Sequence, residues 1–263
     1  MTERLRETFA RARSGGKTVF APYITAGYPR RSDTVPLLLA LEAAGSDVIE
    51  LGMPFTDPLA DGATIQHANQ VALEQEVHLE DCLAMVAEAR AEGLQAPVVL
   101  MGYYNPVLAM GEERCVQRAR EAGADGFIIV DLPPEEAGNF LAACKANDMS
   151  FVPLVAPTTA DERIPKIAAV ADSFLYCVSV AGTTGSRAEL PVELGDFVAR
   201  VRKASSLPLG VGFGISTRKH VEQVGSVADA AIVGSAIIAA IDAGDADGCV
   251  QRVREFVEEL CGG

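Results

Sequence analysis

Residues 98–130 read VVLMGYYNPVLAMGEERCVQRAREAGADGFIIV, and this stretch contains the unit that recurs along the whole chain. An apolar run, Val98–Met101, is followed by the amphipathic segment Glu113–Ala122, by Gly123 and by a second apolar run, Gly126–Val130. Glycine directly after the last periodic residue is the expected end of a helix. Apolar runs this continuous are typical of parallel strands covered on both faces. The stretch therefore predicts a strand, a helix and a second, parallel strand.

The same strand–helix unit recurs on both sides of this stretch. The predicted strands are Val19–Thr25, Val48–Leu51, Val98–Met101, Gly126–Val130, Phe151–Val155, Phe174–Val178, Leu209–Gly212 and Ala230–Val233. The predicted helices are Leu37–Ala44, Leu79–Ala91, Glu113–Ala122, Glu135–Ala146, Asp161–Val170, Val192–Ala204, Thr217–Val224 and Asp245–Leu260, with an extra helix at the N-terminus and a short extra helix, Ala236–Ile241, before the last. Eight such pairs without a low-complexity linker favour a single-domain (β/α)8 TIM barrel over residues 1–263. An open, doubly wound sheet is the alternative.

Composition excludes several classes of partner. The chain has 263 residues, 49% of them apolar, with a formal net charge of −14 and a pI of about 4.7. It contains no run of Lys and Arg, which argues against binding nucleic acid or an anionic membrane. The six cysteines never approach CxxC spacing, and the N-terminus lacks the apolar core of a signal peptide. No apolar run reaches transmembrane length, so we expect a cytoplasmic protein.

Glycines follow the seventh and eighth predicted strands, in Gly210-Val-Gly-Phe-Gly-Ile215 and Val233-Gly-Ser-Ala-Ile237. In a barrel these two loops are neighbours. Gly214 and Gly234 lack a Cβ atom, so their N–H groups can approach an anion closely. Ser235 begins the short extra helix, whose N-terminus would add free N–H groups and a positive dipole end. The pattern predicts a phosphate site and a phosphorylated substrate; ordinary turn chemistry is the alternative.

Carboxylates concentrate in Val48-Ile-Glu-Leu-Gly-Met-Pro-Phe-Thr-Asp-Pro-Leu-Ala-Asp-Gly62. Glu50 lies within an otherwise apolar strand, where desolvation would raise its pKa toward the working pH. No Lys or Arg in any predicted strand is available to pair with it, which favours a role in proton transfer. Asp57 and Asp61 follow in the loop as Asp-Pro and Asp-Gly, which are ordinary turn dipeptides. The residues alone do not decide which of these two aspartates faces a substrate.

Two connections are longer than a barrel needs, Leu51–Leu79 and Val180–Pro191. Both follow the carboxyl end of a predicted strand, where barrel enzymes build their sites. The second contains the Gly-rich segment Ala181-Gly-Thr-Thr-Gly-Ser-Arg187, which we interpret as a lid; a floppy surface loop is the alternative.

The sequence lacks the residues that several catalytic mechanisms require. No lysine ends a predicted strand, as a Schiff-base aldolase requires, and no Ser/His/Asp grouping is present. The three histidines are scattered, with no His-x-His, so we expect no metal. The chemistry that the sequence still supports is metal-free proton transfer on a phosphorylated substrate.

The block Ile49–Gly62, followed by Ala63-Thr-Ile-Gln66, closely resembles the tryptophan synthase alpha chain family. The match continues through Pro22-Tyr-Ile-Thr25, Tyr103-Tyr-Asn-Pro106, Asp131-Leu-Pro133, Gly182-Thr-Thr-Gly185, Gly212-Phe-Gly-Ile215 and Gly234-Ser235, nearly the whole chain. The resemblance implies a retro-aldol cleavage of indole-3-glycerol phosphate to indole and glyceraldehyde 3-phosphate. It implies that Glu50 shuttles the proton and that Asp61 faces the indole N–H and stabilises the developing charge.

The resemblance also implies roles for residues around this pair. Tyr176 would lie beside the two carboxylates. The indole pocket would be lined by Tyr23, Ile65, Met101, Ile128 and Phe213. The phosphate would be held by Gly185, Phe213, Gly214, Gly234 and Ser235, in agreement with the glycine pattern. Asp57 and Thr184 would latch the two lids. Tyr23, where the family commonly has Phe, adds a hydroxyl that needs a partner.

The family works with a beta chain, whose pyridoxal phosphate joins indole to serine, in an α2β2 tetramer. Pro58, Asn105 and Pro133 match its docking face, and the resemblance implies no cofactor on this chain. Two other functions stay open from the sequence: an autonomous indole-producing lyase and a non-catalytic, phosphate-binding regulatory subunit. The presence of both Glu50 and Asp61 argues against the regulatory subunit.

Overall fold

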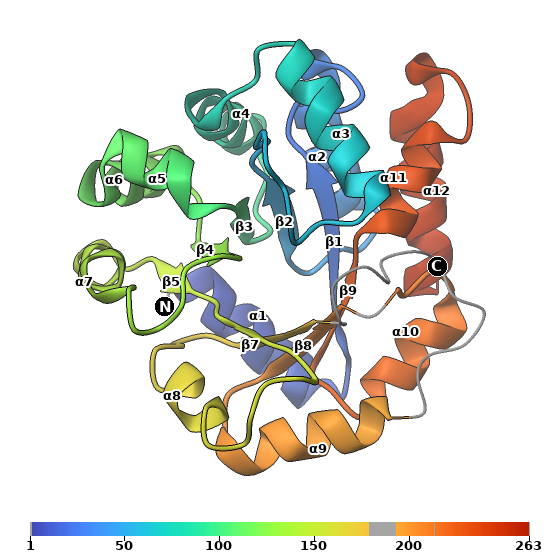
Figure 1. The fold of residues 1–263 in the computed structure, drawn as a ribbon. Coiled ribbons are helices and arrows are strands. Elements are labelled where there is room, and N and C mark those ends of the chain that lie inside the picture. Colours follow the sequence, from blue (N-terminus) through green and yellow to red (C-terminus); the bar gives the residue numbers. More distant parts are fainter. Residues whose placement is uncertain (1, 179–192, 213, 263) are drawn as a thin grey trace.

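Parallel strands form the centre of the molecule, and helices surround them (Figure 1). The structure, a computed structural model, describes residues 2–178, 193–212 and 214–262. The strand segments are β1 (Val19–Thr25), β2 (Ile49–Gly52), β3 (Val98–Gly102), β4 (Gly126–Ile129), β5 (Ser150–Phe151), β6 (Leu154–Val155), β7 (Leu175–Val178), β8 (Leu209–Gly212) and β9 (Ala230–Val233). Their order in the sheet is β5-β4-β3-β2-β1-β9-β8-β7-β6, and every pair is parallel.

The two ends of this order meet in one stretch of chain, because only two residues separate β5 from β6. The N–H of Val152 donates to Phe127 O on the β4 side (2.9 Å), and the N–H of Tyr176 donates to Pro153 O on the β7 side (3.1 Å). Pro153 has no N–H, which accounts for the break in the ladder. The nine segments are thus eight barrel strands, as the predicted strand Phe151–Val155 requires. The (β/α)8 prediction is confirmed, and the open sheet is excluded.

Most helices lie outside the strands, close to where the sequence predicted them. They are α1 (Glu3–Ser14), α2 (Thr34–Ala43), α3 (Ala63–Glu74), α4 (Leu79–Ala91), α5 (Tyr104–Met110), α6 (Glu112–Ala122), α7 (Gly138–Ala146), α8 (Ile164–Ala168), α9 (Leu194–Ala204), α10 (Arg218–Gly225), α11 (Ser235–Asp242) and α12 (Cys249–Cys261), with 3-10 turns η1 (Arg31–Asp33) and η2 (Ala246–Gly248). Gly123, predicted to end a helix, has positive φ, and so do Gly45 and Gly93, which follow the ends of α2 and α4. Helices α3 and α5 lie in segments where the sequence predicted none.

Two apolar layers result from the alternation of side chains along each strand. Ile49 and Leu51 pack outward against the helices, whereas Val48, Val99 and Ile128 pack inside the barrel. Burial on both faces explains why the strands are continuously apolar in sequence.

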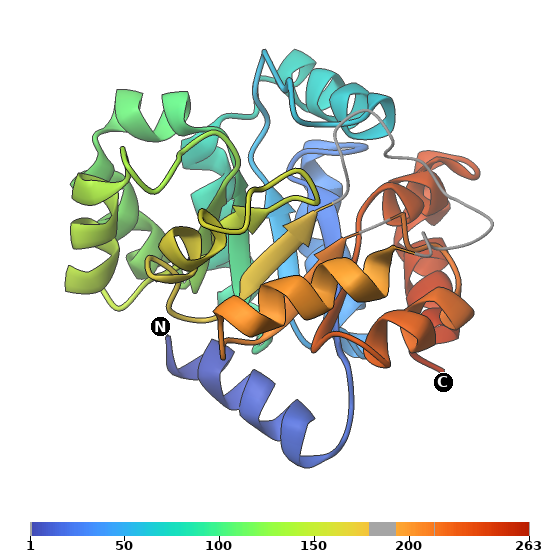
Figure 2. The ribbon, with the colours of Figure 1, turned by 60° about the horizontal axis from the view of Figure 1, so that its bottom comes forward.

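Helix α1 lies across the amino-terminal end of the barrel, as Figure 2 shows at the bottom of the view. Leu5 is fully buried there, and the Phe9 ring packs on Phe174 with 5.3 Å between ring centroids. This end is therefore closed by apolar side chains.

Aspartates join neighbouring strands at the same end. Asp47, Asp125 and Asp229 each precede a strand and accept a hydrogen bond from the N–H of Phe20, Val98 or Leu209, near the start of the strand alongside, at 2.8–3.0 Å. The fully buried Asp125 also pairs with Arg4 and Arg90, each at 3.0 Å. The aspartates of this end thus join strands to one another, and barrel enzymes build their sites at the other end.

Candidate active site

Glu50 lies inside the barrel on β2, in register with Tyr23 on β1 and Val99 on β3. Its side chain is completely buried, and neither carboxyl oxygen has a hydrogen-bond partner within the described part of the chain. Burial alone raises the pKa of Glu50 well above its usual value of 4.5. This is the environment predicted from the sequence: an unpaired carboxyl that can hold a proton near neutral pH.

Asp61 lies in the loop after β2 and is only partly exposed. The Tyr103 hydroxyl donates a hydrogen bond to Asp61 Oδ2 (3.2 Å), and Asn69 Nδ2 donates to the same oxygen (3.4 Å). Burial raises the pKa of Asp61 to about 6, and the two hydrogen bonds oppose the rise. Asp57, in contrast, is exposed, and among the described residues its side chain accepts only from the neighbouring Thr56 hydroxyl (2.6 Å). The structure thus separates the two aspartates that the residues alone left equivalent.

Two buried tyrosines lie within electrostatic range of both carboxyls. Burial, and then the charges of Glu50 and Asp61, raise the pKa of the Tyr23 and Tyr176 hydroxyls, so both tyrosines stay neutral. A Cβ at Gly212 would lie 2.6 Å from the Tyr176 hydroxyl, so this glycine makes room for the ring. The Tyr23 hydroxyl lies 3.1 Å from Thr25 Oγ1, which gives it the partner that a buried hydroxyl needs.

The predicted phosphate loops lie side by side at the same end. A cavity of about 80 Å³ is lined by Ile65, Tyr176, Gly212, Gly214, Ile215, Ile232, Gly234, Ser235 and Ala236. Gly214 has φ +66°, which glycine adopts without strain. Ser235 is the first residue of α11, and the N–H groups of a first helical turn have no intrahelical acceptor. Backbone donors from the ends of β8 and β9 therefore border one cavity.

The remaining predicted residues are distributed as follows. Ile128 and Met101 lie in the barrel interior, and Ile65 reaches the cavity from α3. Pro58, Asn105 and Pro133 follow the carboxyl ends of β2, β3 and β4, and the last two are exposed. Three predicted residues lie outside the described residues: Thr184, Gly185 and Phe213.

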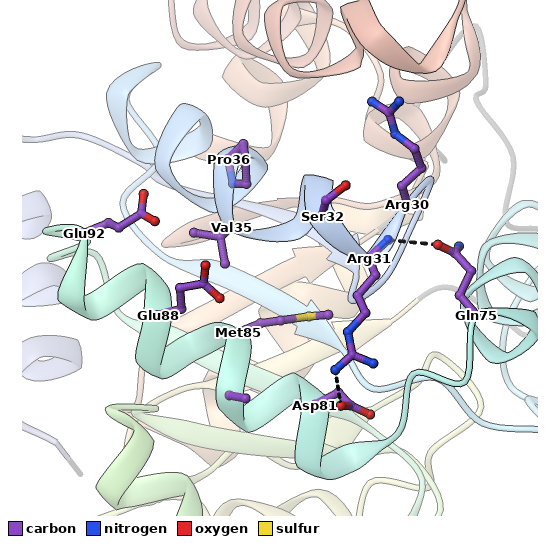
Figure 3. Close-up of a pocket in the computed structure, with 11 residues that line it drawn as sticks. Arg30, Arg31, Ser32, Val35, Pro36, Gln75, Asp81, Met85, Glu88 and Glu92 are labelled. Carbon is purple, nitrogen blue, oxygen red and sulfur yellow. Dashed lines mark hydrogen bonds and ion pairs between the residues drawn. The ribbon is translucent and has the colours of Figure 1, made fainter.

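A larger hollow, of about 670 Å³, lies outside the barrel between η1, α2 and α4 (Figure 3). It contains none of the predicted residues, and its arginines already have partners. The Arg31 guanidinium pairs with Asp81, and the backbone N–H of Arg31 donates to Gln75 Oε1 (2.9 Å). Arg30 pairs with Asp33. Size alone therefore does not mark the functional site.

Over the described ranges, no group of three or more His, Cys, Asp or Glu side chains is arranged to hold a metal ion. Within the same ranges, no helix is long and apolar enough to cross a membrane.

The family model for the tryptophan synthase alpha chain matches residues 9–262. A tryptophan synthase alpha chain of Roseiflexus sp. (strain RS-1) is 51% identical over 259 residues, which cover 98% of this chain and 99% of that one. The chain belongs to the tryptophan synthase alpha chain family. As a member it is a lyase of tryptophan biosynthesis that cleaves indole-3-glycerol phosphate, and it has a beta chain as partner.

Solved structures of the tryptophan synthase family share its fold. Tryptophan synthase subunit alpha from Legionella pneumophila str. Paris superposes with a TM-score of 0.90 at 37% identity, covering 100% of this chain and 98% of that chain. A Mycobacterium tuberculosis tryptophan synthase structure gives 0.92 at 34% identity, with the same coverage. The resemblance read from the sequence is confirmed.

Two residues that contact Asp61 were missed by the sequence interpretation. Tyr103 comes directly after β3, at the end of the barrel where the site lies. Asn69 comes four residues after Ile65 on α3, so both side chains lie on the same face of that helix. Proximity to a strand end was a usable signal for Tyr103, but Asn69 gave none because its helix was not predicted.

Proposed function

We propose that the chain cleaves indole-3-glycerol phosphate by metal-free general acid–base catalysis, with Glu50 as the proton shuttle and Asp61 as the group that stabilises the indole. The observation that carries this proposal is the buried carboxyl of Glu50, which has no partner among the described residues, inside a barrel whose rim holds Asp61 and the glycine loops. A raised pKa suits a group that must both give and take a proton near neutral pH.

The proton balance follows from the bond that breaks. Protonated Glu50 gives its proton to C3 of the indole, which places positive charge near the ring nitrogen. Ionised Asp61 accepts a hydrogen bond from the indole N–H and stabilises that charge. The Glu50 carboxylate then takes the proton of the glycerol hydroxyl as the carbon–carbon bond breaks, which releases indole and glyceraldehyde 3-phosphate. Glu50 ends protonated, as it began.

The remaining site residues bind the two ends of the substrate. Gly214, Gly234 and Ser235, which line the cavity, offer backbone N–H groups to the phosphate. The family resemblance assigns Gly185 and Phe213, outside the described residues, to the same site. The indole ring packs against Tyr23, Ile65, Met101 and Ile128, with Tyr176 beside the carboxyls. The family resemblance adds Phe213, outside the described residues, to this pocket. Asp57 and Thr184 latch the two lids over the bound substrate.

We propose that the beta chain docks on the face that carries Pro58, Asn105 and Pro133, forms an α2β2 tetramer and receives the indole. Pyridoxal phosphate belongs to that partner, and this chain carries no cofactor. The exposed fractions of Leu59 (89%) and Leu108 (57%) support the assignment, since these apolar side chains lie on the same two segments as Pro58 and Asn105. The six free cysteines, five of them buried, suit a reducing compartment such as the cytoplasm.

The decisive experiment incubates the purified chain with indole-3-glycerol phosphate, with and without a beta chain of the family, and measures indole. We expect slow release by the chain alone and faster release with the partner. Rapid release that the partner leaves unchanged would indicate an autonomous lyase. No release under either condition would indicate a non-catalytic regulatory subunit and overturn the proposal.

A further inference from the structure

Tyr103 links Asp61 to the end of β3. The tyrosine is 5% exposed, and its hydroxyl does two things: it donates to Asp61 Oδ2 (3.2 Å) and accepts from the N–H of Ala60 (2.9 Å). One hydroxyl therefore contacts both the carboxylate and the backbone of the residue before it. The loop that carries Asp61 is fixed to the barrel rim at this point.

The ring of Tyr103 is itself held in place. Phe55, from the same loop as Asp61, stacks on it with 5.0 Å between ring centroids and an angle of 26° between ring planes. Such a stacked pair contributes on its own, independently of the hydroxyl. The ring and the hydroxyl can therefore be separated by experiment.

A second donor reaches the same oxygen. Asn69, 3% exposed on α3, donates to Asp61 Oδ2 at 3.4 Å. Both protein donors thus contact Oδ2, and within the described part of the chain no donor contacts Oδ1. This arrangement fixes one carboxylate oxygen and leaves the other for a substrate N–H.

We infer that Tyr103 is a positioning residue for the cleavage reaction, which holds the Asp61 carboxylate ionised and oriented through its hydroxyl, with Asn69 as a weaker second donor. The inference rests on the proposed role of Asp61. It assigns Tyr103 no contact with the reacting atoms.

The surroundings of Asp61 give the inference a pH signature. Burial raises the pKa of Asp61 to about 6, and Tyr103 and Asn69 oppose that rise. Two other titratable hydroxyls, those of Tyr23 and Tyr176, lie within range of the Asp61 charge. Burial raises the pKa of both, so they stay neutral. Without the Tyr103 hydroxyl the pKa of Asp61 rises further, so the carboxylate becomes protonated, and activity is lost, at higher pH.

The test compares Tyr103→Phe with Tyr104→Phe. The first keeps the stacked ring and removes the hydroxyl. The second is a matched control, because the Tyr104 hydroxyl donates to Glu112 (2.8 Å) and not to Asp61. We would measure kcat and KM for indole-3-glycerol phosphate from about pH 5 to about pH 8, together with thermal unfolding.

We expect Tyr103→Phe to lower kcat near pH 6 by about tenfold or more, with KM within roughly twofold of wild type. The acid limb of its kcat profile should move to higher pH by roughly one pH unit. Asn69→Ala should move it in the same direction by less, and Tyr104→Phe should not move it.

A wild-type kcat profile in Tyr103→Phe would overturn the inference, because only the ring would then matter. A lower kcat with an unmoved acid limb and a lower unfolding temperature would also overturn it, since that is the behaviour of a structural residue. If wild-type protein released no indole, the proposed function would fail instead, so the two failures are distinguishable.

Discussion

Replacing Glu50 with glutamine removes the ionisable proton of this side chain and keeps its shape. Glutamine has nearly the same volume, and Glu50 is fully buried without a partner within the described residues, so the barrel interior should keep its packing. If Glu50 transfers the proton, the kcat for cleavage should fall by about 10²–10⁴-fold in the variant. KM should change little, because the phosphate end of the site comes from β8 and β9.

The same substitution should change how stability depends on pH. Burial holds the pKa of Glu50 in the folded chain well above the 4.5 of the unfolded chain. As the pH rises above the unfolded value, the unfolded state loses this proton first, so stability declines until the folded pKa is reached. The decline is at most about 1.4 kcal/mol per pH unit for one proton. Glutamine removes this decline, so the stability of the variant should rise relative to that of wild type as the pH increases above about 5.

Urea denaturation of both proteins at several pH values measures this difference, and indole release measures the activity. Every other titrating group is common to the two proteins and cancels in the comparison. Near-normal indole release by Glu50→Gln would remove Glu50 from the mechanism. A difference in unfolding free energy that stayed constant with pH would show that the buried carboxyl does not titrate as its burial requires.

Three further substitutions probe the rest of the molecule. Asp61→Asn should lower kcat by about 10²-fold or more at a near-normal KM, and turnover close to wild type would contradict its role. Gly234→Ala should weaken binding of inorganic phosphate in calorimetry without lowering the unfolding temperature, since the added methyl meets only ordinary contacts; unchanged affinity would misplace the phosphate site. Asp125→Ala should cost about 3–5 kcal/mol of unfolding free energy, because it leaves Arg4 and Arg90 unpaired. A loss below about 1 kcal/mol in denaturant titration would disprove that account.

The strands were predictable because burial on both faces makes them continuously apolar. Leu209–Gly212 and Ala230–Val233 have the predicted bounds. Helix α3 was not predicted, because it begins after Gly62 without a side-chain cap and ends without glycine or proline. Helix α5 spans seven residues, too few to show a helical period. Local sequence pattern therefore failed for two reasons: α3 lacks signals at its ends, and α5 is too short to show a period.

The site divides in the same way. Glu50 was predictable because a carboxylate within an apolar run is anomalous in the sequence itself. The choice between Asp57 and Asp61 was not, because both belong to ordinary turn dipeptides. What distinguishes Asp61 is its contact with Tyr103, 42 residues away, and with Asn69 on a helix the sequence did not reveal. A contact between distant segments has no local pattern, so only the resemblance could make that choice.

The carboxylates at the two ends of the barrel differ in their hydrogen bonding, and this difference separates residues that stabilise the fold from residues of the site. At the amino-terminal end, Asp47, Asp125 and Asp229 each accept a backbone N–H of the neighbouring strand, so they lock strand pairs together. At the carboxyl end, within the part of the chain that the structure describes, Glu50 has no partner and one oxygen of Asp61 accepts no hydrogen bond, and burial raises the pKa of both. Pairing Glu50 would stabilise the fold but would fix its proton. Because the paired aspartates lie at the end opposite the site, substitutions there should change stability and leave the chemistry intact.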